Sequence, residues 1–154
     1  MATLDPVAIF HAAETAAMTS GLFERVNGHE PKSPPGQGLT AAVWVDRLGP
    51  VPARSGLAST SARVLLTARI YTSMTAEPQD AIDPRVLGAA HHLIRAWSGD
   101  FDLALGADYE VDLLGAHGVP LEARAGYVQV GTVLNRVYTV TVPLIINDAW
   151  DQVR

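Results

Sequence analysis

The sequence predicts an α+β fold, in which a mainly antiparallel sheet of about five strands carries two packed helices. Residues 62–72 alternate between an apolar set and a set that contains two arginines. This period of two is typical of a strand with one buried face. Two Asp-Pro pairs, at 5–6 and 83–84, each precede an apolar stripe with helical spacing, and Gly131-Thr132 joins two strand-like segments as a hairpin. The resulting order is α-β-β-α-β-β-β, which favours the α+β class.

The first helix is predicted to begin at Asp5-Pro6, because Asp can cap a helix and Pro fits its first position. Its apolar stripe contains Phe10, Ala13 and Ala17, with Ile9 at the edge, and Gly21 ends it. The second helix begins at Asp83-Pro84, and Gly99 lies just past its end. Its predicted buried stripe is Val86, Leu87, Ala90, Ile94 and Trp97.

Five strands are predicted, and the first places Val43 and Val45 on one face and Trp44 and Asp46 on the other. In the second, Val64, Leu66, Ala68 and Ile70 share the apolar face. Pro143 falls inside the last strand and must lie where no ladder donor is needed, near an edge or a bulge. The five predicted strands are residues 39–48, 62–72, 109–114, 124–130 and 134–146.

Length and composition predict one domain over residues 1–154, with long loops at 27–38 and 49–61. Hydrophobic residues make up 48% of the chain, which is enough for one core. The formal net charge is −5, from 16 acids and 11 bases, and Lys32 is the only lysine. An acidic chain of this kind is not expected to bind DNA strongly over its whole surface, because phosphate binding needs clustered positive charge.

Several classes of protein are excluded or disfavoured by composition. The chain has no cysteine, which excludes disulfides and thiolate metal sites. No apolar run approaches the roughly 20 residues that cross a bilayer, and the N-terminus does not have the pattern of a secretory signal. We expect a soluble protein made in the cytoplasm, without membrane association.

Two short motifs suggest ligand sites that their context disfavours. Gly36, Gly38 and Ala41 match a form of the dinucleotide fingerprint, but a proline-rich loop precedes them and a strand follows, where the fingerprint needs a strand and then a helix. His91 and His92 are adjacent on a helix and point about 100° apart, so they cannot chelate one metal ion as an i, i+4 pair would. No cofactor and no metal is therefore predicted.

No catalytic residue is predicted. Glu110 and Asp112 share a strand face, as a general acid and base would, but acids along the wet face of a strand are ordinary. The chain also has no nucleophile elbow and no phosphate loop. The loose carboxylate cluster to which these two belong is Asp100, Asp102, Asp108, Glu110 and Asp112.

Arginines on the predicted strands are the main candidates for an interaction surface. They either form scattered ion pairs with the more numerous acids or provide charge complementarity between copies of the protein. The two proline- and glycine-rich loops are either flexible surface or segments that become ordered against a neighbour. The candidate interface, either with another subunit of this protein or with a tube-like assembly partner, comprises Arg47, Arg54, Leu57, Arg63, Arg69, Arg124 and Arg136.

Strings of residues along most of the chain resemble small tail proteins of long-tailed phages that infect actinobacteria. These strings include V-N-G-H-E-P-K, P-P-G-Q-G-L-T-A-A-V-W-V-D-R, G-P-V-P-A-R-S-G-L, R-I-Y-T-S-M, Q-D-A-I-D-P-R-V, S-G-D-F-D-L, V-D-L-L-G-A-H-G, A-R-A-G-Y and P-L-I-I-N-D-A-W. On these residues the chain is similar to the tail terminator family of siphovirus-type phages, typified by the terminator of phage lambda.

The resemblance implies a non-enzymatic virion protein at the neck end of the tail, assembled in the cytoplasm of the bacterial host. Members form a ring, normally of six copies, that stops addition of the major tail tube protein and offers a docking surface to the head-tail connector. Genomic DNA passes through the ring, and the acidic balance of this chain suits passage without specific binding.

Two alternatives remain open from the sequence. One is a neighbouring part of the same tail, either a head-closure or connector protein or a tail-tube subunit. The other is a small soluble ligand-binding or enzymatic α+β domain, which predicts an enclosed pocket with converging polar groups. The structural role predicts instead that apolar area around Trp44, Leu57 or Trp150 is covered only by neighbouring copies.

Overall fold

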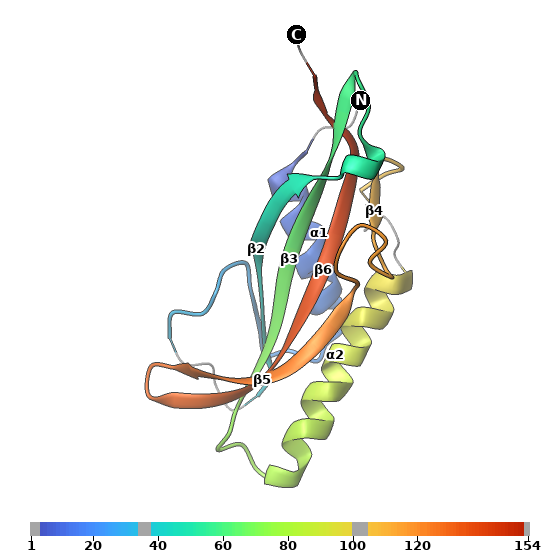
Figure 1. Ribbon diagram of the computed structural model, residues 1–154. Helices are drawn as coiled ribbons and strands as arrows, with labels where there is room; N and C mark the ends of the chain where they lie inside the picture. The colour runs from blue at the N-terminus through green and yellow to red at the C-terminus, as the bar shows by residue number, and fades with distance from the viewer. Residues whose placement is uncertain (1–3, 34–37, 100–104, 153–154) are drawn as a thin grey trace.

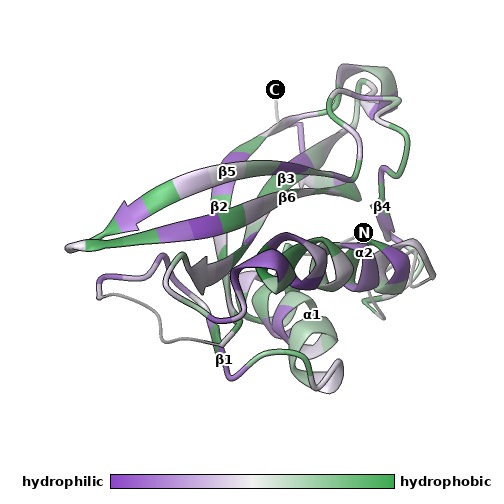
Figure 2. Cartoon of the chain, turned by 90° about the horizontal axis from the view of Figure 1, so that it is seen from below, coloured by the Kyte–Doolittle hydropathy of each residue, from purple (hydrophilic) through white to green (hydrophobic). Residues whose placement is uncertain are grey.

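A six-stranded sheet carries both helices on one of its faces, as the computed structural model shows (Figure 1). The structure describes residues 4–33, 38–99 and 105–152. Seen from the end, the sheet forms one layer and the two helices form the other (Figure 2). The expected α+β class is confirmed, with one additional short strand.

The elements follow one another in an order close to the predicted one. The central strand β3 (Ser59–Ser73) lies between β2 (Thr40–Pro50) and β6 (Val133–Asp151), antiparallel to both. Both β4 (Tyr109–Val111) and β5 (Glu122–Val130) pair with β6. The remaining elements are the strand β1 (Arg25–Asn27), the helices α1 (Pro6–Thr19) and α2 (Ile82–Gly99), and the single 3₁₀ turns η1 (Pro52–Arg54) and η2 (Gln79–Ala81).

The main core lies between the sheet and the helices. The four residues predicted for the apolar face of β3, from Val64 to Ile70, are all buried there. Helix α1 contributes Ile9, Ala13 and Ala17 to the same core. Small side chains on this stripe allow the helix to lie close to the sheet. The predicted alternation of β3 is confirmed, whereas the buried face of α1 is turned slightly from its prediction: Ile9, placed at the edge, is 2% exposed, and Phe10, placed on the stripe, is only partly buried.

The start of α1 is capped as the sequence predicts. Asp5 accepts a hydrogen bond from the backbone N–H of Ala8, at 3.1 Å, and Pro6 occupies the first helical position. The helix ends at Thr19, two residues before Gly21, whose positive φ of 70° suits a residue without a Cβ. The cap and the glycine together set the length of α1.

Helix α2 differs from its predicted face at two positions. Val86, Ala90 and Trp97 are fully buried, as predicted, but Leu87 is 55% exposed. Leu93, which the predicted stripe omits, is completely buried. Leu93 lies seven residues after Val86 and therefore on the same side of the helix, whereas Leu87 lies about 100° away from Val86.

Strand boundaries differ most around the predicted loop at 49–61. Strand β2 continues to Pro50, which pairs with Ala62, and β3 already begins at Ser59. The irregular connection is therefore much shorter than predicted, and η1 occupies part of it. The predicted loop at 27–38 begins after β1, which pairs in parallel with β2 and was missed because three residues give no readable period.

The last strands also differ from their predicted lengths. Strand β4 stops at Val111, because Asp112 turns the chain into the following loop. Strand β6 runs on to Asp151, across an irregularity between the pairings of Thr60 and Ala62 that includes Asp148, with a positive φ of 54°. Such irregularities break the alternation from which strand ends are predicted.

Pro143 lies where the sequence requires it. On one side of β6, the pairing with β5 ends at Thr141 and the pairing with β4 begins at Leu144. The carbonyl of Pro143 accepts a hydrogen bond from Asp112 N–H on that side. Because the N and C=O of a strand residue point the same way, the missing N–H of Pro143 falls at the interruption between two neighbouring strands.

Candidate interaction surface

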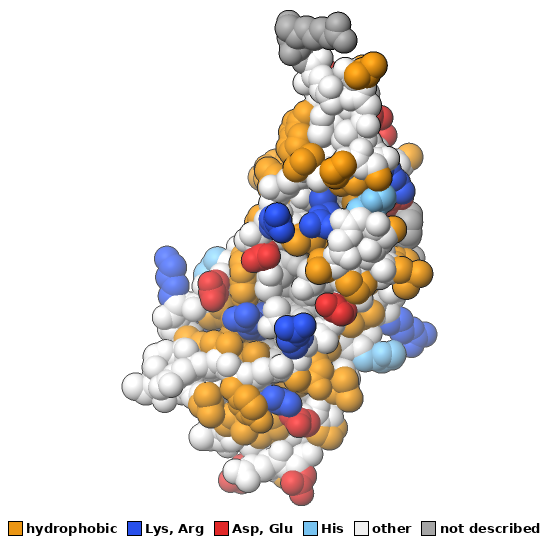
Figure 3. Space-filling model, viewed as in Figure 1, with side chains coloured by type: hydrophobic (Ala, Val, Ile, Leu, Met, Phe, Trp, Pro, Cys, Tyr) orange, Lys and Arg blue, Asp and Glu red, His pale blue; other side chains and the backbone are white. Residues whose placement is uncertain are grey.

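Four of the predicted arginines project from the face of the sheet that the helices leave uncovered. We call Arg47, Arg63, Arg69 and Arg124 the arginine face. Cross-strand partners share a face, and Arg69 and Arg124 both pair with Thr139, while Arg63 pairs with Ile145. Figure 3, which views this side, shows blue side chains across the middle of the sheet.

A β-bulge brings Arg47 to this face. Regular alternation from Val43 would place Arg47 on the helix side with Val45. The register instead shifts between Val45 and Arg47, so that Val45 pairs with Leu66 and Arg47 pairs with Leu65. The extra residue is Asp46, which the sequence placed beside Trp44. A bulge reverses the facing of every residue beyond it.

Arg69 lies half-buried at the centre of the arginine face. Its Nε donates to Oγ1 of Thr139 at 2.9 Å, and its guanidinium lies 5.3 Å from the ring centre of Trp44 and 6.0 Å from that of Tyr71. Burial raises the pKa of the Tyr71 hydroxyl above 10.0, and the hydrogen bond with Arg69 opposes that rise. Arg69 is thus positioned by two aromatic rings and a hydroxyl.

Arg63 contacts a loop that crosses the upper part of the same face. Its Nη1 donates to the backbone carbonyl of His117. Asp112 shapes this loop, because its two carboxylate oxygens accept the backbone N–H groups of Ala116 and His117, each at 2.9 Å. Asp112 is buried and engaged in these bonds, so it has a structural part in this loop.

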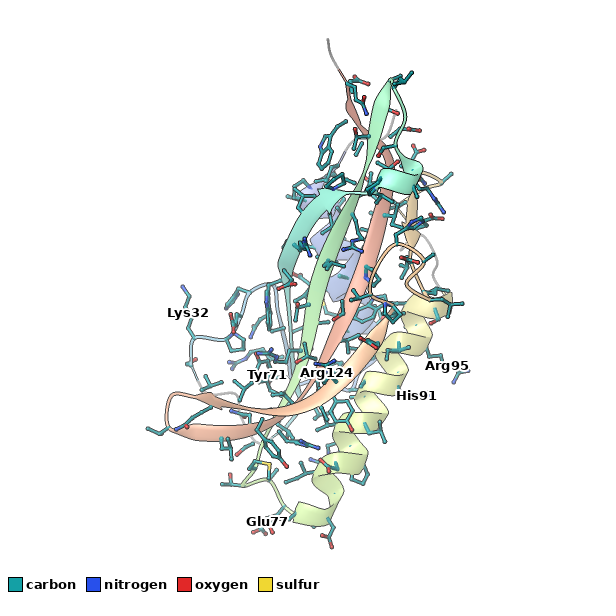
Figure 4. The ribbon with its side chains drawn as sticks, in the orientation of Figure 1. Lys32, Tyr71, Glu77, His91, Arg95 and Arg124 are labelled. Atoms are coloured by element: carbon teal, nitrogen blue, oxygen red, sulfur yellow. The ribbon has the colours of Figure 1, made fainter. Side chains whose placement is uncertain are left out.

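Arg124 lines an open groove beside β5, with a volume of about 470 Å³. Arg69 and Thr139 line the groove from the sheet, and Val119 lines it from the crossing loop. Glu122 is the one acidic residue among its lining residues. Figure 4 labels Arg124 on this side of the molecule, close to Tyr71 in the view. The groove therefore presents two guanidinium groups and one carboxylate to whatever enters it.

The other two arginines form ion pairs elsewhere. Arg54, in η1, pairs with Glu110 and donates to Oδ1 of Asn147 at 3.2 Å. Arg136 projects to the helix side, where its Nε lies 2.8 Å from Oδ1 of Asp83 and its guanidinium lies 4.5 Å from the ring centre of Tyr127. The hydrogen bond with Asp83 raises the pKa of Arg136. For Arg54 and Arg136, the structure thus favours ion pairing within the chain, one of the two interpretations that the sequence left open.

Arginines of the arginine face have no such carboxylate partner. Within residues 4–33, 38–99 and 105–152, the two ion pairs of Arg54 and Arg136 are those closer than 4.0 Å. Of the six predicted arginines, Arg54 and Arg136 are therefore ion-paired within the described chain, whereas the four of the arginine face are not. A sequence shows the faces of β3 but not the bulge that adds Arg47 or the pairing that joins Arg124.

A second surface is apolar and lies at the start of α1. Leu4, Phe10, Val45 and Leu48, with Pro6, Ile9 and Val64, line a cleft of about 150 Å³ without polar lining; we call it the apolar cleft. Val45 and Leu48 are 45% and 53% exposed, although they belong to the helix side of β2. The sequence prediction missed Leu48 here, because the bulge determines its facing.

Leu57, the one apolar member of the predicted interface, is 88% exposed at the tip before β3. Trp150 is 37% exposed near the end of β6, and Trp44 is half-buried beside Arg69. Hydrophobic side chains gather on the upper flank and near the lower end in Figure 3. Exposed apolar residues therefore lie at several separate places on this chain.

The other sequence motifs have ordinary surroundings. His91 and His92 are both exposed on α2, and the described residues contain no group of three or more His, Cys, Asp or Glu side chains that could hold a metal ion. Gly38 leads into β2, while Gly36, Asp100 and Asp102 lie outside the described residues. Among the described helices, none has the length and apolar character needed to cross a membrane.

Comparison with known proteins gave one kind of match. No protein-family model matches the sequence, and no curated protein matches it. Among solved structures, the chain is similar to the "PVC sheath/tube terminator in extended state" of an extracellular contractile injection system, with 13% identity and a TM-score of 0.48. The match covers 100% of this chain and 62% of the other, so this chain spans less than two thirds of its neighbour's length.

Proposed function

We propose that this chain is a structural tail protein that assembles into a ring of six copies at the head-proximal end of a phage tail tube. There it stops tube polymerisation and provides the docking surface for the head-tail connector. The tail role is supported by the sequence strings that resemble terminators of siphovirus-type actinobacteriophages. The assembly role is supported by the surfaces of this chain.

One observation carries the assembly role. Two helix-side residues of strand β2, Val45 and Leu48, are left about half exposed around the apolar cleft, beside Leu4 and Pro6 at the start of α1. Apolar surface that continues a core but lacks its cover marks a site where another chain packs. Each buried Å² of such surface contributes about 25 cal/mol. Covering it with a neighbouring copy or with the last tube layer is therefore favourable.

The competing ligand-binding or enzymatic role has less support from the described residues. Two of their hollows, of about 430 and 470 Å³, are open to solvent. A small-molecule site is normally a concave pocket that buries most of its ligand. The polar groups that converge beside β5 are two arginines and a glutamate on an open face, an arrangement that fits contact with a protein surface.

Electron microscopy of the protein mixed with tubes of the major tail protein tests the proposal. We expect a single layer of density at one end of each tube. Leu48→Glu should abolish this layer, whereas Leu87→Glu, at 55% exposure against 53% for Leu48, should retain it. Density along the whole tube would identify a tube subunit instead, and loss of the layer in both variants would remove the role given to the apolar cleft.

A further inference from the structure

We infer that the groove beside β5 binds the acidic segment 77–83 of a second copy of this chain. The inference rests on the proposed ring and names the two surfaces that meet in it. The groove supplies Arg69 and Arg124, and the segment supplies Glu77, Asp80 and Asp83.

The groove offers positive charge that the chain itself does not neutralise. Arg124 is exposed and Arg69 is half-buried, and neither has a carboxylate within ion-pair distance in the described part of the chain. Glu122 in the same groove offsets one of the two charges. A partially desolvated guanidinium interacts more strongly with an incoming carboxylate than a fully solvated one, because the local dielectric constant is lower.

The segment 77–83 places three acids within seven residues, and two of them, Glu77 and Asp80, have no ion-pair partner in the described part of the chain. Both of these side chains are exposed. Asp83 pairs with Arg136 but remains 64% exposed. Four other described carboxylates are already engaged within the fold: Asp5 caps α1, Glu110 pairs with Arg54, Asp112 shapes the crossing loop and Asp148 accepts from Ser59. The remaining exposed ones, such as Glu30, Asp46 and Asp108, are spread along the chain.

The two surfaces lie on different parts of the subunit, as a ring requires. The segment 77–83 forms the lower end of the molecule, where Figure 4 labels Glu77, whereas the groove lies on the helix-free face of the sheet. A contact between unlike surfaces of identical subunits is head-to-tail, and it closes into a ring when the rotation per subunit allows it. Charge complementarity across such a contact also sets its register.

Disulfide trapping tests the contact directly, because the natural chain contains no cysteine. Val119→Cys places a thiol in the groove and Gln79→Cys places one between Glu77 and Asp80, and both leave all five charges in place. Mixing the two variants under mild oxidation, alone and with tail tubes, should give a 119–79 disulfide-linked dimer. The control, Met18→Cys mixed with Gln79→Cys, uses a position on α1 that is more exposed than Val119, at 57% against 39%, and should give none.

Charge reversal then tests the cause of the contact. Arg124→Glu in the Val119→Cys chain should lower the trapped fraction about tenfold, since like charges across an interface repel. Asp80→Arg in the Gln79→Cys chain should restore it, and Arg95→Glu, on the exposed side of α2, should leave it unchanged. Equal trapping in the control pair, no trapping with or without tubes, or loss without restoration would each overturn the inference.

The two proposals fail in different ways. A protein that caps tubes but gives no 119–79 disulfide keeps the proposed function and loses this contact. A protein that gives the disulfide but leaves tube ends bare keeps the contact and loses the tail role. Trapping of the groove cysteine by a tube subunit, in place of a second copy, overturns the inference.

Discussion

Two leucines on helix α2 provide a matched test of how the helix packs on the sheet. Leu93 is completely buried in the main core, whereas Leu87, six residues earlier, is 55% exposed. Leu93→Ala removes buried methyl groups and leaves a cavity, so we expect it to lower the free energy of unfolding by about 2–5 kcal/mol. Leu87→Ala removes groups that already contact water and gains helix propensity, so its cost should be below about 1 kcal/mol.

Urea unfolding followed by circular dichroism measures both changes at a concentration where the protein is monomeric. The two variants differ only in position, so their difference reports the face that α2 presents to the sheet. Equal costs for the two variants, or a larger cost for Leu87→Ala, would refute the packing described for this helix.

Three further outcomes follow from side-chain contacts. Asp112→Ala should cost about 1–3 kcal/mol, because two loop N–H groups lose their acceptor, and urea unfolding should show no comparable cost for the exposed control Asp108→Ala. Tyr71 should ionise above pH 10.0, because burial favours its neutral form. Its contribution to stability is therefore complete below pH 10.0 and is lost as pH rises through the pKa of the folded state. The difference in tyrosinate absorbance between the wild type and Tyr71→Phe measures this titration. A double-mutant cycle on Arg136 and Asp83 should give a coupling of at most about 1 kcal/mol that falls with salt, since Asp83 is mostly exposed, and a salt-independent coupling would contradict this account.

Much of the fold can be predicted from the periodicity of apolar residues and from the residues that begin and end helices and turns. The alternation from Val64 to Ile70 identifies the buried face of the central strand, and Asp5-Pro6 sets the beginning of α1. Gly131 and its neighbour mark the β5–β6 hairpin. These signals are local, so they survive without knowledge of the tertiary structure.

The candidate surfaces could be predicted only in part, because they depend on contacts between distant segments. Arg63 and Arg69 share a face through simple alternation, and this much is visible in the sequence. Arg47 joins them only through the bulge at Asp46, and Arg124 only through the pairing of β5 with β6. Arg136 was grouped with the others by composition, but its register places it on the opposite face.

The apolar cleft has the same origin. Leu48 reads as an ordinary strand residue, and its place in the cleft depends on two segments that lie far apart in the chain: the end of β2 past the bulge, and Leu4 and Pro6 at the start of α1. Which segments meet is a tertiary property, and a pattern of single residues does not contain it.

Electron microscopy of tail tubes incubated with this protein, with the layers of added density counted at each tube end, tests the proposed role at the tube end. We expect one ring-shaped layer at one end of the tube and no further growth of the tube from that end. Bare ends, or added density along the length of the tube, would contradict it.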